Sequence, residues 1–203
     1  SLNKINHIQE VKQFNEPNST YKLCFDDEFY FILQKEYGPD IADELRNEEI
    51  RIMADNYSKF IVHAQKAKDE KLYMPYYPNG TLFSLYSLAP EKRVKLSFVD
   101  KIVIIIEIAT ALESLHSHDE YHGNLSSQSI YIDSSKDAYL GSICYDRENE
   151  RSNTVQKGPY FYRPPEDLVY NENNKDKKEP KSVDIYSFGV LMHEIITEIS
   201  PNS

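Results

Sequence analysis

The stretch YHGNLSSQSIYI, from Tyr121 to Ile132, decides how this sequence is interpreted. It has the composition of a polar loop and holds a histidine, an asparagine and three serines, but no aspartate or glutamate. An amide or a hydroxyl cannot take up a proton at neutral pH, and neither is as good a ligand for a hard cation as a carboxylate. We therefore expect a loop at this place that lacks carboxylate chemistry.

The part of the chain far upstream of this loop favours strands. Residues 8–36 are rich in aromatic and branched residues with partial alternation, which is typical of short strands. Residues 40–56 place apolar side chains near helical spacing among charged ones, as in a helix that packs on a sheet. Two further strands are predicted at 60–68 and 71–77. The predicted order of this part is therefore β-β-α-β-β.

After the turn signal YPNG the pattern becomes helical, so a boundary is predicted near residues 77–80. Helices are predicted over three segments: 81–88, 97–118 and 183–199. Ser97, followed three residues later by Asp100, is typical of a capping box that starts the second of them. The polar segment 171–182 is predicted to be a loop.

Composition limits the classes of function. The 203 residues include 33 acidic and 23 basic ones, which gives a formal charge of −10. This charge disfavours binding to nucleic acid or to an anionic membrane. Cys24 and Cys144 lie far apart without a metal-ligand pattern, which favours a reduced, cytoplasmic protein. The apolar run from Ile102 to Ala109 is too short to span a bilayer, and residues 1–17 do not have the pattern of a signal peptide.

Several segments, taken in order from Ile32 to the C-terminus, resemble the motifs of a protein kinase domain. The segment ILQKEY is similar to the strand whose lysine, here Lys35, contacts the ATP phosphates, and NEEIRIM is similar to the helix whose glutamate, here Glu49, pairs with it. LYMPYYPNGTL resembles the hinge, with Met74 as gatekeeper. HGNLSSQSI resembles the catalytic loop, GPYFYRPPE the end of the activation segment, and SVDIYSFGV the central helix with its aspartate, Asp184.

The resemblance implies an α+β, two-lobe protein kinase-like fold. Residues 1–76 would form a small β-rich N-lobe with one main helix, and residues 77–203 a mostly α-helical C-lobe that stops after its central helix. Asp184 would then accept hydrogen bonds from the backbone of the catalytic loop. Four apolar or histidine side chains fall on the positions of the hydrophobic stack that joins the lobes: Met53, Ala64, His122 and Ile143.

The same resemblance implies that the catalytic positions are not intact. Asn124 stands where the family has the catalytic aspartate, and Ser126 stands where serine/threonine kinases have the catalytic-loop lysine. Ser129 and Ser142 stand at the positions of the two magnesium ligands. We therefore expect no metal site and no phosphoryl transfer of the usual kind.

The nucleotide site is expected to be degenerate as well. Residues 1–37 contain no glycine, whereas a phosphate-binding loop needs glycines so that backbone N–H groups can approach the phosphates. Leu33 and Tyr131 are predicted to fill the adenine pocket. The candidate nucleotide-binding residues are Lys35, Glu49, Met74, Tyr76 and Tyr77. No cofactor is expected, and the alternative is that ATP binds without magnesium. For Lys35, the alternative to a nucleotide-binding role is that it is an ordinary surface lysine of a strand.

The leading hypothesis is a pseudokinase that acts as a protein-interaction or scaffolding module in signalling. Two alternatives stay open: an atypical ATP-binding kinase with weak phosphotransfer, and a nucleotide sensor that works without magnesium. Protein partners are expected, and nucleic acid and membranes are not. In the family, the glutamate at the end of the activation segment, here Glu166, pairs with an arginine in later helices, and the resemblance implies that it has no such partner in this sequence. Helix 183–199 is apolar around much of its circumference. We expect a missing chain segment, or alternatively a partner, to cover that helix.

Overall fold

The structure is a computed structural model of the 203-residue chain. It describes these residues: 9–16, 19–25, 31–38, 43–55, 57–66, 71–89, 91–143, 160–165 and 179–201. Among the positions singled out from the sequence, Cys144 and Glu166 lie outside the described residues. The same holds for most of the predicted loop 171–182.

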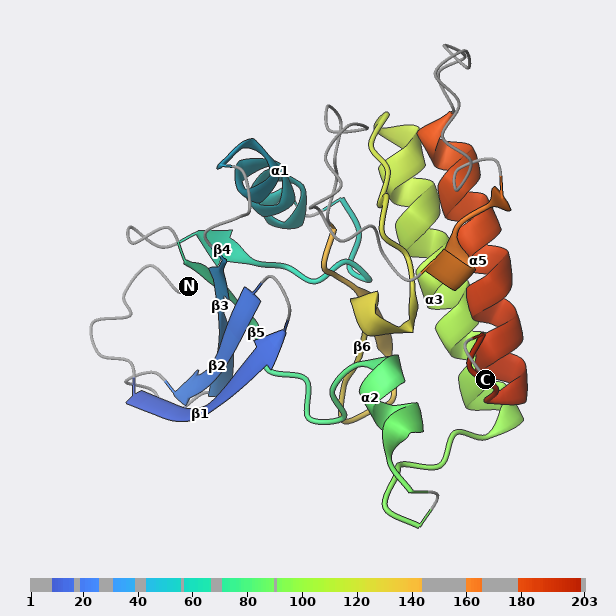
Figure 1. Cartoon of the computed structure of the whole chain (residues 1–203), viewed down its shortest axis with the longest axis horizontal. Coiled ribbons are helices and arrows are strands. Elements are labelled where there is room, and N and C mark those ends of the chain that lie inside the picture. The colour runs from blue at the N-terminus through green and yellow to red at the C-terminus, as the bar shows by residue number, and fades with distance from the viewer. Residues whose placement is uncertain are drawn as a thin grey trace.

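The N-terminal part is an antiparallel sheet with one helix. Its strands are β1 (Gln9–Glu16), β2 (Ser19–Phe25), β3 (Phe31–Tyr37), β4 (Gln65–Lys66) and β5 (Leu72–Pro75), in the order β1-β2-β3-β5-β4. Helix α1 (Asp43–Ala54) joins β3 to β4 and lies to one side of the sheet (Figure 1). Three strands therefore precede the helix, and the predicted order β-β-α-β-β was wrong by one strand. The aromatic and branched residues predict strands in this segment but do not mark the turns that divide them into three.

The C-terminal part is mainly helical. It contains α2 (Leu82–Ser87), α3 (Phe98–Ser117), the 3-10 turns η2 (Ser127–Ser129) and η3 (Tyr160–Tyr162), and α5 (Pro180–Thr197). Strands β6 (Ile130–Ile132) and β7 (Ala138–Leu140) form a small separate sheet. In Figure 1 the long helices α3 and α5 run side by side, and the small sheet lies between them and the N-terminal sheet.

Local sequence explains where the two long helices begin. Ser97 caps α3, because its side chain accepts a hydrogen bond from the N–H of Asp100 while the Asp100 carboxylate accepts one from the N–H of Ser97. The predicted capping box is therefore present. Helix α5 starts at Pro180, three residues before the predicted start, because a proline is well suited to the first turn of a helix.

One continuous apolar core connects the two parts. It extends from Leu33 and Leu72 in the sheet through Ile104 and Leu112 in α3 to Leu191 in α5. Backbone hydrogen bonds also cross between the parts: the N–H of Val62 donates to the carbonyl of Leu140 at 2.8 Å, and that of Leu140 to the carbonyl of Phe60 at 2.7 Å.

Candidate functional site

The central feature of the candidate site is a buried ion pair between β3 and α1. The Lys35 ammonium lies 2.8 Å from both carboxylate oxygens of Glu49, and the two residues are 6% and 2% exposed. Burial disfavours the charged ammonium and is the largest single influence, but the attraction and hydrogen bonds of Glu49, together with Tyr37 and Tyr131, outweigh it and raise the pKa of Lys35 above its ordinary value. Lys35 is therefore a buried cation, and the alternative of an ordinary surface lysine is wrong.

Tyrosine rings surround this ammonium. The Lys35 Nζ atom lies 4.7 Å from the ring centroid of Tyr37 and 5.8 Å from that of Tyr21. Tyr37 follows Lys35 by two residues, so both side chains lie on the same face of β3, and Tyr21 is the cross-strand partner of Lys35 in β2. An ammonium over aromatic rings is stabilised by their negative faces. The cation is thus balanced by groups of the chain itself.

The residues predicted to line an adenine site are mostly buried. Leu33, Met74, Tyr77 and Tyr131 are 8%, 1%, 5% and 6% exposed, and Tyr76 is partly buried. The ring centroid of Tyr77 lies 5.3 Å from that of Tyr131, and burial raises the pKa of Tyr77 above its ordinary value. Tyr77 and Tyr131 therefore pack on each other, and the four buried side chains all belong to the apolar core.

The serines of the loop bond to each other. Ser129 Oγ donates to the carbonyl of Ser126 at 2.8 Å and accepts from its N–H at 3.1 Å, while Ser126 Oγ accepts from the N–H of Gln128 at 3.3 Å. Both serines are 1% exposed. They form a reciprocal capping box for the turn η2. Their hydroxyls are therefore engaged in local structure.

Ser142 is also bonded to a side chain of the candidate site. Its hydroxyl lies 3.2 Å from the hydroxyl of Tyr131. The preceding residue, Gly141, approaches the Tyr131 ring so closely that a Cβ atom on it would lie 2.9 Å from ring carbon Cε2 and 2.9 Å from a methyl group of Val62. Tyr131 is thus packed against the backbone that carries Ser142.

His122 and Asn124 complete the loop. His122 is fully buried, its Nε2 lies 2.9 Å from the carbonyl oxygen of Gly141, and its Nδ1 accepts from the N–H of Asn124 at 3.1 Å. This pattern requires the neutral tautomer with hydrogen on Nε2, and burial lowers the pKa of His122 below its ordinary value, which agrees with it. The Oδ1 atom of Asn124 is buried and lacks a hydrogen-bond partner among the described residues.

The carboxylate of Asp184 in helix α5 binds the backbone of this loop. Asp184 in α5 accepts from the N–H of His122 at 2.7 Å and from the N–H of Gly123 at 2.9 Å, and its Oδ2 also lies 2.9 Å from Nε2 of His116. Asp184 is 1% exposed, so these hydrogen bonds compensate the burial of its charge.

Comparison with known proteins identifies the family. Residues 32–202 match the family described as protein tyrosine and serine/threonine kinase. The match covers more than half of the chain and includes all the positions described above except Tyr21. The chain belongs to the protein kinase family.

Some of its kinase relatives carry names that declare them inactive. The chain is 31% identical to the "Probable inactive L-type lectin-domain containing receptor kinase III.1" of Arabidopsis thaliana over 66% of its own length, and 30% identical to the mouse "Inactive serine/threonine-protein kinase TEX14" over 62%. It is 26% identical over 83% of its length to the "Calmodulin-binding receptor-like cytoplasmic kinase 3" of Arabidopsis thaliana. The chain spans 19%, 9% and 34% of the lengths of these three relatives.

In this kinase domain the hydrophobic-stack positions are all buried. Met53, Ala64, His122 and Ile143 are each 0% exposed.

Within the part of the chain that the structure describes, there is no helix long and apolar enough to cross a membrane and no cluster of three or more His, Cys, Asp or Glu side chains placed to hold a metal ion.

Sequence reasoning missed a buried polar cluster under the catalytic loop. Ser127 Oγ donates to Glu194 at 3.1 Å and lies 3.0 Å from the hydroxyl of Tyr162, which itself donates to Glu194. Burial raises the pKa of Glu194 above its ordinary value. In the sequence, the only sign that Glu194 is buried among polar partners is that it is a charged residue within an apolar helix.

Proposed function

We propose that this kinase domain is a pseudokinase that binds other proteins and does not transfer phosphate. The observation that carries the proposal is the state of the catalytic positions. Asn124 replaces the carboxylate that would accept the substrate proton, and the hydroxyls of Ser129 and Ser142 are hydrogen-bonded within the chain. Phosphoryl transfer depends on metal ions that neutralise the phosphate oxygens, and these side chains do not fit a magnesium site.

The nucleotide site does not fit ATP any better. A phosphate group that approached Lys35 could share the ammonium with Glu49, but it would meet the rings of Tyr21 and Tyr37, whose centroids lie 5.8 and 4.7 Å from Nζ. The base would have to displace Tyr131, whose hydroxyl is held by Ser142. We therefore propose that the chain works without nucleotide and without metal, and that Leu33 and Tyr131 occupy the space of the adenine.

Two relatives support an inactive role because their names describe them as inactive kinases. We propose further that the inactive domain binds protein partners, as a scaffold in signalling. Four apolar side chains of α5 are each at least 38% exposed in this chain, namely Ile185, Tyr186, Met192 and Ile196, and we propose that a further chain segment or a partner covers them. We propose a cytoplasmic location, as the name of a third relative suggests for that protein.

One observation favours a second candidate, a nucleotide sensor or weak kinase that binds ATP without magnesium. The Lys35–Glu49 pair is formed, and it is the arrangement that places the lysine for phosphate binding in active kinases. This candidate needs Tyr21 and Tyr131 to move aside when the nucleotide enters.

The test is thermal unfolding of the purified 203-residue chain with millimolar ATP, once with magnesium and once with a chelator. A ligand at about 100 times its dissociation constant stabilises the native state by about 2.7 kcal/mol, which would raise the melting temperature by roughly 5–11 °C in a domain of this size. We expect no shift under either condition. A shift that Lys35→Ala abolishes would support the sensor or weak kinase instead, and a radiolabel transfer assay would then separate those two.

A matched variant tests the reason for the absent shift. Replacing Tyr21 with Val and Tyr131 with Leu removes the two aromatic side chains and keeps Lys35 and Glu49. This variant is expected to gain a nucleotide-dependent shift if the tyrosines block the site. A variant that folds and still shows no shift would mean that Tyr21 and Tyr131 are not what prevents binding, and that the missing glycine-rich loop and metal ligands, or Tyr37, prevent it.

A further inference from the structure

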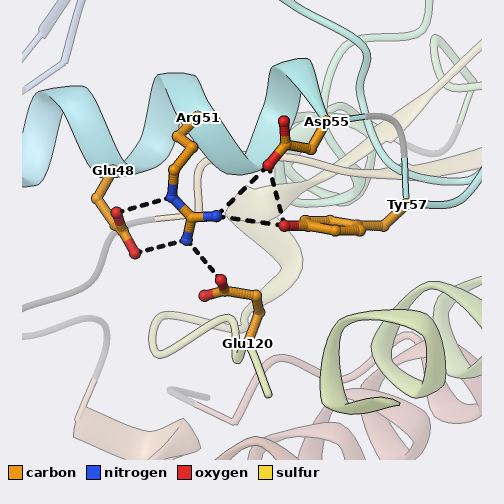
Figure 2. Close-up of polar contacts among 5 residues, drawn as sticks. All are labelled: Glu48, Arg51, Asp55, Tyr57 and Glu120. Atoms are coloured by element: carbon orange, nitrogen blue, oxygen red, sulfur yellow. Dashed lines mark hydrogen bonds and ion pairs between the residues drawn. The ribbon is translucent and has the colours of Figure 1, made fainter. Parts of the chain in front are cut away.

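Arg51, in α1, is the centre of a network of polar contacts (Figure 2). Its Nε and Nη2 atoms donate to the two carboxylate oxygens of Glu48 at 3.1 and 2.8 Å. Its Nη1 atom donates to Asp55 at 3.4 Å and to the hydroxyl of Tyr57 at 3.2 Å. All three nitrogens of the guanidinium are therefore engaged, in the forked geometry that an arginine offers and a lysine does not.

The network also crosses from the N-terminal lobe to the C-terminal lobe. The Nη2 atom of Arg51 donates to Glu120 Oε1 at 2.5 Å, and the two residues are 69 positions apart in the chain. Glu120 lies between the end of α3 and His122, its backbone N–H donates to the carbonyl of Leu115 at 3.0 Å, and it is 9% exposed. The backbone of Glu120 is thus attached to the C-terminal lobe, directly before the catalytic loop.

The segment that follows α1 is fixed to the same helix end. Ser114 in α3 donates to the carbonyl of Tyr57 at 2.6 Å, and the ring of Tyr57 lies 4.7 Å from that of His118. Tyr57 therefore offers its hydroxyl to Arg51 from a position that α3 defines. The guanidinium meets two groups, Tyr57 and Glu120, that are anchored on the C-terminal lobe.

Helix α1 is held from two opposite faces. Glu49 and Arg51 are two residues apart, which corresponds to a rotation of about 200° around an α-helix. Glu49 points to Lys35 on β3, and Arg51 points to Glu120 next to the catalytic loop. A rotation or outward shift of α1 that broke one of these contacts would disturb the other, because both side chains leave the same rigid element.

We infer that Arg51 and Glu120 form an interlobe clasp that holds α1 in the orientation in which the Lys35–Glu49 pair is closed, without help from a nucleotide. The clasp positions α1 and takes no part in chemistry. It replaces the coupling that a bound ligand between the lobes would otherwise provide, so α1 and the surface around it are expected to keep one arrangement. This goes beyond the proposed function, because it holds whether or not a nucleotide can bind.

The test measures the closed pair directly. Only the neutral amine of a lysine reacts with an acetylating reagent, so a Lys35 that is held by Glu49 reacts slowly. We expect Arg51→Met and Glu120→Leu each to raise the acetylation rate of Lys35, and the amide hydrogen exchange rate of residues 49–54, by about three- to ten-fold. The double variant is expected to show no more than the larger single effect, because each change alone already opens the clasp.

Two control variants separate the clasp from general stability. Arg93→Met removes another arginine–glutamate pair, the 2.6 Å contact between Arg93 and Glu198, far from α1. Glu48→Gln weakens a contact within α1 and leaves the interlobe pair in place. Both are expected to change the acetylation of Lys35 by less than about two-fold.

Other results would overturn the inference. Unchanged Lys35 acetylation in Arg51→Met and Glu120→Leu would show that the pair stays closed without the clasp. An equal increase in Arg93→Met, or faster exchange throughout β3 and β5 in the clasp variants, would show that the effect is general destabilisation. Glu120→Leu keeps a side chain of similar volume, so it gives a reading even if Arg51→Met does not fold. None of these readings uses nucleotide, so they stand or fall apart from the test of the proposed function.

Discussion

Replacing Lys35 with methionine is expected to destabilise the domain strongly, although the residue has no catalytic task in the proposed function. The side chains of Lys35 and Glu49 are 7% and 2% exposed, so solvent screens their interaction little. The substitution removes two 2.8 Å hydrogen bonds and leaves the Glu49 carboxylate buried without its counter-charge. Breaking a buried pair in this way costs about 3–5 kcal/mol, a large fraction of the roughly 5–15 kcal/mol by which domains are stable.

The double variant Lys35→Met with Glu49→Met gives the sharper result. Two apolar side chains of similar length replace both charges, and such replacements are often neutral, so we expect the double variant to lie within about 2 kcal/mol of the wild type. Urea unfolding followed by circular dichroism measures the free energy of unfolding of the wild type, Lys35→Met, Glu49→Met and the double variant. These four values complete a double-mutant cycle.

The reasoning would be refuted by a small effect of the single change. A loss below about 1 kcal/mol in Lys35→Met is the value for an exposed pair, and it would mean that the pair is open to solvent in solution. Additive single effects would lead to the same conclusion, because side chains that contact each other in a buried site should show a large coupling energy.

Three further predictions concern the loop and its support. Gly141→Ala places a Cβ atom 2.9 Å from the Tyr131 ring, and we expect it to lower the free energy of unfolding by about 1–3 kcal/mol in urea denaturation. Since burial lowers the pKa of His122 below 6.5, the unfolded chain takes up a proton more readily than the native one, so stability should fall as the pH drops below about 6.5. A titration of stability against pH, repeated with His122→Asn, should show this part of the slope disappear; an unchanged slope would contradict a buried neutral histidine. Ser97→Ala removes the cap of α3 and should cost about 1 kcal/mol, measured by the melting temperature against the wild type, with no change speaking against the capping box.

Sequence motifs were sufficient to place the residues of the site that share a fixed spacing. The order and spacing of the motifs predicted that Asn124 lies in the catalytic loop and that Asp184, in the central helix, contacts this loop. Both residues belong to segments, HGNLSSQSI and SVDIYSFGV, that match kinase motifs. Lys35 and Glu49 were found in the same way, since each stands at a known place in a strand or a helix. What the motifs could not give was the surroundings of these side chains.

The surroundings depend on contacts between distant parts of the chain. Tyr21 reaches Lys35 only through the register of two strands, and that register follows from the hairpin geometry and not from either segment alone. The Arg51–Glu120 contact joins residues 69 apart, and both look like ordinary surface charges in the sequence. The missing strand in the predicted order has the same origin, because strand boundaries depend on pairing partners more than on local composition.

The loss of phosphoryl transfer that we propose for this site has a physical reason. In a kinase that uses ATP, the metal ligands and the lysine must remain partly unsatisfied in the protein, because their partners are supplied by the substrate. Here Ser129 is hydrogen-bonded to Ser126 and Ser142 to Tyr131, and the Lys35 ammonium lies near two tyrosine rings in addition to its pair with Glu49. Buried polar groups that already have partners stabilise the empty domain, and recruiting any one of them for a ligand would cost the hydrogen bonds that it now makes. Under the proposed function, such an arrangement favours one fixed conformation over turnover, which suits a module that binds other proteins.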